Sequence, residues 1–99
     1  MLKKQYLKTK KVCKVTFALQ DPGAESVYLV GEFNNWDEKA TPMAQQKGGK
    51  FSVTLELEVG REYRYRYLVN GTEWRNDEAA DRYIPNPFSG DDSVVSTHP

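Results

Sequence analysis

Apolar and polar residues alternate with a period of two along most of this chain, which predicts β-strands and offers no convincing amphipathic helix. Residues 13–19, 51–58 and 63–69 carry this pattern, and the continuous apolar run at 27–30 suits a strand covered on both faces. Asn70-Gly71 is the strongest hairpin signal, because both central residues of a type I′ turn need positive φ. We therefore expect an all-β antiparallel sandwich of roughly five to seven short strands.

The strand at 63–69 has two faces of different character. Its tyrosines at 63, 65 and 67 share one face with Val69, and we expect this row to enter the core. Arg64, Arg66 and Leu68 share the opposite face. On the strand at 13–19, Cys13 lies on the apolar face and is predicted to be a buried thiol.

Both tryptophans lie beside predicted loops. Trp36 follows two asparagines and precedes Asp37, and the stretch from there to Met43 has no periodicity and reads as a long loop. Trp74 comes just after the predicted hairpin turn. From spacing alone, each tryptophan is either a core anchor of the sandwich or an exposed aromatic platform. Residues 76–92 are polar and punctuated by prolines, and Val94-Val95 is predicted to close a final strand.

Length and charge limit the classes of function. The 99 residues suffice for one domain, and the net charge of zero argues against a nucleic-acid-binding protein. The first fourteen residues nevertheless hold six lysines and no acid. We interpret residues 1–11 as a basic N-terminal extension that is a solvated tail, with contact to an acidic partner or a nucleic-acid backbone as the alternative, and residues 12–99 as the sandwich.

Few residues here suit catalysis or metal binding. One cysteine and one histidine, His98 near the C-terminus, make neither a disulfide, a zinc site nor a catalytic triad, so we expect no metal and no cofactor. Acidic pairs such as Asp77-Glu78 are adjacent residues in predicted surface loops, a poor arrangement for two carboxylates facing each other across a cleft. We therefore expect no enzymatic activity. The lone cysteine indicates a cytoplasmic compartment, and no apolar run suits a signal peptide or a membrane span.

Three segments carry a resemblance to a known family. Residues 27–36 read VYLVGEFNNW, residues 65–71 read YRYLVNG ahead of Trp74, and PNPF at 85–88 begins the closing loop and strand. Together they resemble the family 48 carbohydrate-binding modules, over roughly residues 12–96. This family includes the glycogen-binding domain of the AMP-activated protein kinase β subunit and the N-terminal early-set domains of isoamylases and glycogen branching enzymes. The resemblance implies an immunoglobulin-like, early-set sandwich and makes residues 12–99 a carbohydrate-binding domain.

The resemblance also implies a set of site residues. Trp36 and Trp74 correspond to the two tryptophans of the family's sugar platform, and Arg66 to the basic residue that bonds sugar hydroxyls. Phe88 and Asp92 fall nearest the large apolar residue and the asparagine of the closing loop, with Ser93 as the alternative to Asp92. Arginine stands where the kinase subunit has lysine, which keeps the charge but changes the reach. Aspartate in place of asparagine keeps an acceptor and loses the amide donor.

Two functions follow as expectations. The first is non-catalytic binding of α-1,4-linked glucans, such as glycogen, starch or malto-oligosaccharides, through a shallow aromatic surface. The second is a structural or adaptor domain that docks onto a glycogen-metabolising enzyme or another protein without binding sugar. Neither function involves nucleic acid or a membrane as partner.

Overall fold

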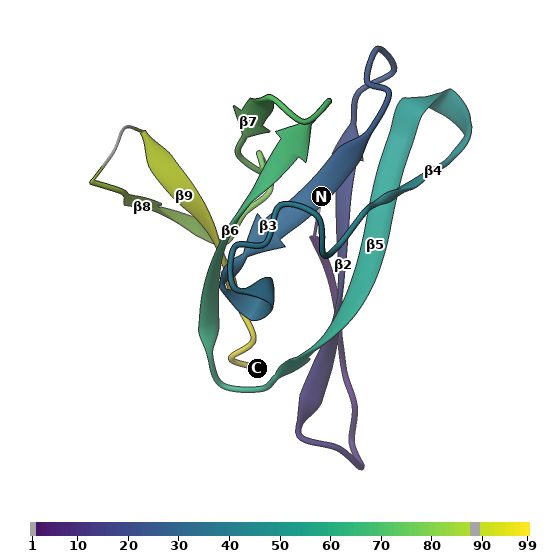
Figure 1. Ribbon diagram of the computed structural model, residues 1–99. Helices are drawn as coiled ribbons and strands as arrows, with labels where there is room; N and C mark the ends of the chain where they lie inside the picture. Colours follow the sequence, from purple (N-terminus) through teal and green to yellow (C-terminus); the bar gives the residue numbers. More distant parts are fainter. Residues whose placement is uncertain (1, 88–89) are drawn as a thin grey trace.

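The computed structural model describes residues 2–87 and 90–99, which form two antiparallel sheets packed as a sandwich (Figure 1). In spatial order, the first sheet consists of β1 (Leu2–Tyr6), β2 (Val12–Gln20), β5 (Lys50–Glu58) and β4 (Ala44–Gln45). The second consists of β3 (Val27–Gly31), β6 (Glu62–Val69), β9 (Asp91–Ser96) and β8 (Arg82–Pro85), and β7 (Glu73–Arg75) also pairs with β6. Two short 3₁₀ segments are η1 (Glu32–Asn34) and η2 (Lys47–Gly49). The expected all-β, immunoglobulin-like sandwich is confirmed.

The core lies between the two sheets and follows the predicted alternation. Tyr65 and Tyr67 of β6 are fully buried, and Phe17 of β2 meets the Tyr65 ring edge-on at a centroid distance of 5.0 Å. Cys13 is also fully buried, as predicted. Edge-to-face packing of this kind stabilises aromatic pairs beyond the burial of their surface. The tyrosine row is therefore a structural element of the core.

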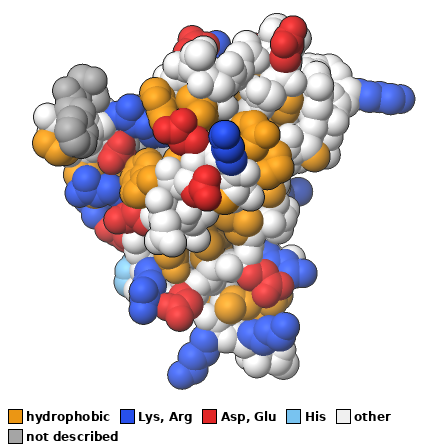
Figure 2. All heavy atoms as spheres, viewed as in Figure 1, with side chains coloured by type: hydrophobic (Ala, Val, Ile, Leu, Met, Phe, Trp, Pro, Cys, Tyr) orange, Lys and Arg blue, Asp and Glu red, His pale blue; other side chains and the backbone are white. Residues whose placement is uncertain are grey.

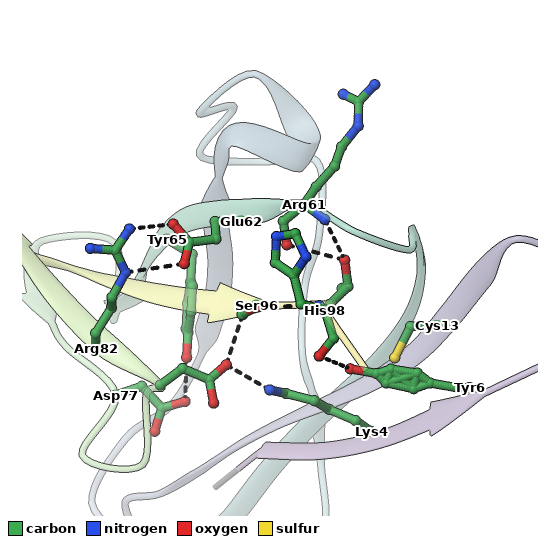
Figure 3. Close-up of polar contacts among 12 residues, drawn as sticks. Lys4, Tyr6, Cys13, Arg61, Glu62, Tyr65, Asp77, Arg82, Ser96 and His98 are labelled. Atoms are coloured by element: carbon green, nitrogen blue, oxygen red, sulfur yellow. Dashed lines mark hydrogen bonds and ion pairs between the residues drawn. The ribbon is translucent and has the colours of Figure 1, made fainter.

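Asp77 corrects one sequence expectation. The sequence places it in a surface loop, but it is buried, and its Oδ2 accepts hydrogen bonds from the Tyr65 hydroxyl at 2.7 Å and the Tyr67 hydroxyl at 3.0 Å. Figure 3 shows the Tyr65 hydroxyl directed at this carboxylate. A buried tyrosine hydroxyl needs an acceptor, and the carboxylate supplies one to both rings. Burial first, and the nearby Asp77 second, raise the pKa of both tyrosines.

The N-terminal segment also differs from the solvated tail expected of it. Leu2–Tyr6 forms β1, which pairs with β2 in antiparallel register, and Leu2 and Tyr6 pack against the core. Lys4 Nζ lies 2.7 Å from Asp81 Oδ2, and the Tyr6 hydroxyl donates to the His98 carbonyl at 3.0 Å, so that β1 is held to the opposite sheet (Figure 3). The assignment of residues 12–99 as the binding domain by itself stays a prediction.

Basic side chains remain exposed around the hairpin that joins β1 to β2. Lys8, Lys10 and Lys11 are exposed there, and Figure 2 shows lysine and arginine side chains at the end of the molecule where this hairpin lies. No acidic residue precedes Asp21 in the sequence. The expected concentration of positive charge is therefore present, carried by a β-hairpin instead of a tail.

Two segments expected to be loops contain strand pairing. Thr41 and Met43 hydrogen-bond to the edge of β3, through Leu29 N to Thr41 O and Met43 N to Val27 O, each at 2.9 Å. The proline-rich stretch after β7 contains β8, which pairs with β9. Among the described residues, no helical segment has the length and apolar character needed to cross a membrane.

Candidate functional site

A groove of about 680 Å³ lies on the face of the second sheet that points away from the core. Strands β6, β7 and β9 supply part of its lining, and the loops after β3 and after β8 supply the rest. The lining residues are Glu32, Trp36, Arg64, Arg66, Trp74, Asn86, Pro87 and Asp92. The groove thus combines two large aromatic rings, two guanidinium groups and two carboxylates.

The alternation of β6 sends its arginines into the groove. Tyr65 and Tyr67 point into the core, so Arg64 and Arg66 point to the opposite face, as predicted. Trp74 of β7 lies directly across from Leu68 in the strand register and therefore shares that outer face. The hairpin of β6 and β7 thereby presents Arg64, Arg66 and Trp74 on the same face of the sheet.

Arg66 lies where β6 changes its neighbour. On one side of β6, β9 pairs with residues 62–65 and β7 pairs with residues 67–69, so Arg66 faces the break between them. Its Nη2 donates to the Asp91 carbonyl at 2.7 Å, and its Nε donates to Asp92 Oδ1 at 3.0 Å. Asn76 Nδ2 also donates to the Asp91 carbonyl, at 2.8 Å. The arginine and the asparagine together close the gap between β7 and β9.

Asp92 lines the groove but is largely covered. Its side chain is only 10% exposed and forms ion pairs with Arg66 at 3.0 Å and Arg64 at 3.8 Å. It also accepts a hydrogen bond from Asn86 Nδ2 at 3.2 Å, which fixes the loop after β8. Ser93, the alternative to Asp92, is fully buried, and its hydroxyl contacts Asp77 N and Asn76 Oδ1. Asp92 is therefore the one of the two that lies at the groove.

The loop that carries Trp36 is organised by Asn34. The Asn34 Oδ1 accepts from Gly31 N at 3.0 Å, and its Nδ2 donates to Leu29 O at 2.9 Å and Thr41 Oγ1 at 3.0 Å. Such side-chain bonds to the backbone replace the ladder bonds that end with β3. Trp36 N then donates to Gly31 O at 2.8 Å and closes the loop.

Both tryptophans are partly exposed on the surface. Trp36 is 39% exposed and Trp74 is 41% exposed, and neither belongs to the core between the sheets. The open choice between core anchor and exposed ring is thereby decided for both residues in favour of exposure. Flat, half-exposed indole rings beside hydrogen-bonding groups can stack on the apolar face of a ligand while the polar groups contact its rim.

Four of the five site residues expected from the sequence lie at this groove. Trp36, Arg66, Trp74 and Asp92 all line it. Phe88 lies outside the described residues. Arg64 was missed as a groove residue, although its shared face with Arg66 was the available signal. The remaining contributors from loops, Glu32 and the Asn86-Pro87 pair, carry no periodic signal that would have identified them.

The two carboxylates of the groove each have a partner within the protein. Asp92 is paired with arginines, and Glu32 Oε1 accepts from the Arg64 backbone N–H at 2.7 Å. Within residues 2–87 and 90–99, no three His, Cys, Asp or Glu side chains are grouped so that they could hold a metal ion. What the groove offers is two stacking faces, guanidinium donors and carboxylate acceptors.

Known proteins show where similar sequences occur. The family model described as carbohydrate-binding module 48 (isoamylase N-terminal domain) matches residues 5–89. The chain is 38% identical over 72 residues to the 1,4-alpha-glucan branching enzyme GlgB 2 of Xanthomonas oryzae pv. oryzae, covering 72% of this chain and 10% of that enzyme. It is 34% identical over 67 residues to the GlgB enzyme of Butyrivibrio fibrisolvens (68% of this chain, 10% of the enzyme), and 40% identical over 58 residues to that of Aquifex aeolicus (56% and 9%). The chain therefore spans about a tenth of the length of these relatives.

Proposed function

Because the chain belongs to the carbohydrate-binding module 48 family, we propose that it binds α-1,4-linked glucans without chemically altering them. The observation that carries the proposal is the pair of half-exposed tryptophans, Trp36 and Trp74, at one groove. Glucose rings present apolar C–H faces for stacking and hydroxyls at their rims, which matches indole faces beside polar groups. The relatives are named as enzymes that act on 1,4-alpha-glucans, which supports this class of ligand.

The backbone at Trp36 supports a binding role for this residue. Asn35 and Trp36 have φ of 58° and 56°, in the left-handed region that bulky residues rarely occupy. For a bulky residue such as Trp36 this conformation costs about 1–2 kcal/mol, whereas asparagine adopts it more readily. A strained aromatic residue that is also exposed gains little by burial, and strain of this kind is concentrated at functional sites. The loop holds the ring at the groove despite the cost.

The roles proposed for the other residues follow from their contacts. Trp36 and Trp74 stack on sugar rings. The Arg66 guanidinium lies at the floor of the groove, where its hydrogen bonds to Asp91 and Asp92 hold it in place. Asp92 holds this arginine, and Phe88 adds apolar contact from the closing loop. The proposal keeps all five residues, with Asp92 acting through Arg66 because its own carboxylate is largely covered.

The direct test of binding is a titration. The protein is titrated with maltoheptaose or β-cyclodextrin, with tryptophan fluorescence and calorimetry as readouts and a cellulose-derived oligosaccharide as the control ligand. We expect saturable binding of the α-glucans alone, between micromolar and millimolar, or about −8 to −4 kcal/mol. Exposed hydrogen bonds largely replace bonds to water, so affinity is modest. Absence of heat and of a fluorescence change with every α-glucan would refute the proposal.

Truncation of the platform gives the first testable prediction. Trp36→Ala and Trp74→Ala should each weaken maltoheptaose binding by about 1–2 kcal/mol, because each removes a stacking face. Tyr83→Ala is the matched control, since Tyr83 is an exposed aromatic residue, 44% exposed, that does not line the groove. Calorimetry measures affinity, and thermal unfolding verifies that each variant is folded. Unchanged affinity in both tryptophan variants would exclude this groove as the site.

The adaptor function remains the second candidate because of the basic hairpin between β1 and β2. Lys8, Lys10 and Lys11 are exposed there and offer a surface to an acidic partner, such as a glycogen-metabolising enzyme. A protein that binds no α-glucan but associates with such an enzyme in a salt-dependent manner would favour this reading. We propose a cytoplasmic setting for either function, since a reducing compartment suits a chain whose single thiol, Cys13, is unpaired.

A further inference from the structure

The charged side chains of the groove fall into two pairs, Arg66 with Asp92 and Arg64 with Glu32, and the pairs differ in how exposed they are to solvent. Arg66 and Asp92 bond to each other, and their side chains are only 19% and 10% exposed. The Arg64 side chain is 38% exposed, and its contact with Asp92 is an ion pair at 3.8 Å, beyond hydrogen-bond distance. Of the two arginines that line the groove, Arg64 therefore has the guanidinium that is more accessible to a ligand.

Glu32 complements Arg64 at the same part of the groove. Glu32 Oε1 accepts from the Arg64 backbone N–H at 2.7 Å, which fixes the carboxylate beside β6. Glu32 is an exposed residue at the start of η1, and it lines the groove together with Arg64. A carboxylate held by one oxygen still has acceptor sites on the other. Arg64 and Glu32 thus contribute a five-donor group and an acceptor to the lining of the same groove.

Distance along β6 separates this pair from Trp74. Trp74 lies opposite Leu68, and Arg64 is four residues away on the same face, which corresponds to about 13 Å along a strand. That span exceeds a single sugar ring. A ligand that stacks on Trp74 therefore needs several linked sugars to reach Arg64.

We propose that Arg64 and Glu32 form a charged hydroxyl-binding subsite at the end of the groove and make the protein prefer longer α-glucans over short ones. This inference rests on the proposed function, because it assigns residues to the same ligand. The guanidinium donates to sugar hydroxyls and the carboxylate accepts from them, in the manner in which charged groups strengthen hydrogen bonds. The Arg64–Asp92 pair does not account for this arginine, since the two groups are 3.8 Å apart and the Arg64 end of the pair is exposed to solvent, so the contact contributes little to stability.

The experiment compares the affinities for maltoheptaose and maltotriose by calorimetry. Arg64→Gln and Glu32→Gln remove one charge each, and glutamine at position 32 keeps an oxygen for the Arg64 amide. We expect each variant to bind maltoheptaose about three- to tenfold more weakly while affinity for maltotriose changes less than about twofold, so that the preference for the longer chain shrinks. Arg64→Lys keeps the charge toward Asp92 but lacks the planar fork, and it should show an intermediate loss with unchanged thermal stability.

Two further variants separate the possible failures. Arg61→Gln is the matched control, because Arg61 pairs with Glu58 in the turn between β5 and β6 and does not line the groove. Trp36→Ala reports on the platform. If Trp36→Ala loses affinity while Arg64→Gln and Glu32→Gln bind both sugars like the wild type, the subsite is refuted and the proposed function stands. If the wild type binds neither sugar, the proposed function fails and this inference fails with it. Equal weakening of both sugars by Arg64→Gln also overturns the length preference.

Discussion

At the scale of single residues, Gly31 determines where the Trp36 loop can lie. A Cβ at this position would lie 2.6 Å from the Arg64 carbonyl oxygen, 2.8 Å from Tyr65 Cβ and 2.9 Å from Phe33 Cζ. Its backbone is extended, at φ −170°, so conformational freedom is not the reason for glycine. The requirement is space, because Gly31 pairs with Tyr65 of β6 and a side chain here would enter the room that Tyr65 and Phe33 occupy.

We predict that Gly31→Ala destabilises the protein by about 1–3 kcal/mol, since two of the three close atoms cannot move without shifting β6. It should also weaken glucan binding, because Trp36 N bonds to Gly31 O. Urea unfolding measures the first effect and calorimetry the second. Gly23→Ala is the control, as its added Cβ would meet only the Asp21 carboxylate, at 3.7 Å. A Gly31→Ala protein as stable as Gly23→Ala would contradict this account.

At the scale of elements, the sequence pattern identified the strands that cover the core and missed three strands at sheet edges. β2, β5 and β6 have neighbours on both sides and show clear alternation. β1, β4 and β8 each end a sheet, as does β3, whose continuous apolar run nevertheless identified it. Edge strands are commonly short, charged or proline-bearing, which hinders wrong pairing and also removes the alternation on which prediction depends. β1 carries Lys3 and Lys4, β4 has two residues, and β8 ends at Pro85.

The regular period of the strands also explains which groove residues could be predicted from the sequence. Residues on β6 and β7 were accessible to prediction because a strand's period fixes the face of each side chain. Phe88 and Asp92 were assigned only through the family resemblance, and the pairing of Asp92 with Arg66 depends on the meeting of β6 and β9, which are 26 residues apart at this contact. A contact of that separation leaves no trace in local periodicity.

β1 covers the edge of β2 that carries Cys13, and we expect it to protect this thiol from reagents in solution. Tyr6 lies opposite Cys13 in the register, and burial raises the pKa of this thiol. In the intact protein we expect Ellman's reagent to react with Cys13 only at the rate of unfolding, since a buried, protonated thiol is a poor nucleophile. Deletion of residues 1–6 should speed the reaction at least about tenfold by making β2 the edge of the sheet.

The control for this deletion is Lys4→Gln, which removes the ion pair with Asp81 but leaves β1 in the sheet. Such a partly exposed pair is worth about 0–1 kcal/mol, so the thiol should stay protected. Rapid labelling of Cys13 in the intact protein would show that β1 does not cover it.

At the scale of the whole molecule, the carboxylate of Asp77 joins β6 to the loop before β8 through two tyrosine hydroxyls. Folding therefore requires that Tyr65 and Tyr67 stay neutral. Both have pKa values raised above the ordinary value of 10.0, by burial first and by the negative Asp77 second. In the unfolded chain the same tyrosines lose their protons near the ordinary value.

It follows that the folded state holds more protons than the unfolded state above pH 10, and the stabilisation present below that pH is lost as pH rises. We predict that the free energy of unfolding falls by up to about 1.4 kcal/mol per pH unit for each of the two tyrosines. Urea unfolding at a series of alkaline pH values measures the slope. Tyrosinate absorbance provides the check, because full titration of all six tyrosines in the still-folded protein would contradict the prediction.

The division of β6 into a tyrosine face and an arginine face also has a consequence for how this protein can change over generations. Positions 64 and 74 are exposed at the groove, whereas positions 65 and 67 are fixed in the core. Under the proposed function, substitutions at the outer positions should alter recognition while leaving the packing between the sheets untouched, so we expect them to be close to neutral for folding. A library randomised at Arg64 and Trp74 should accordingly retain a high proportion of folded members. The strand that secures the sandwich, together with its neighbour β7, is thus also where we expect new ligand preferences to be selected.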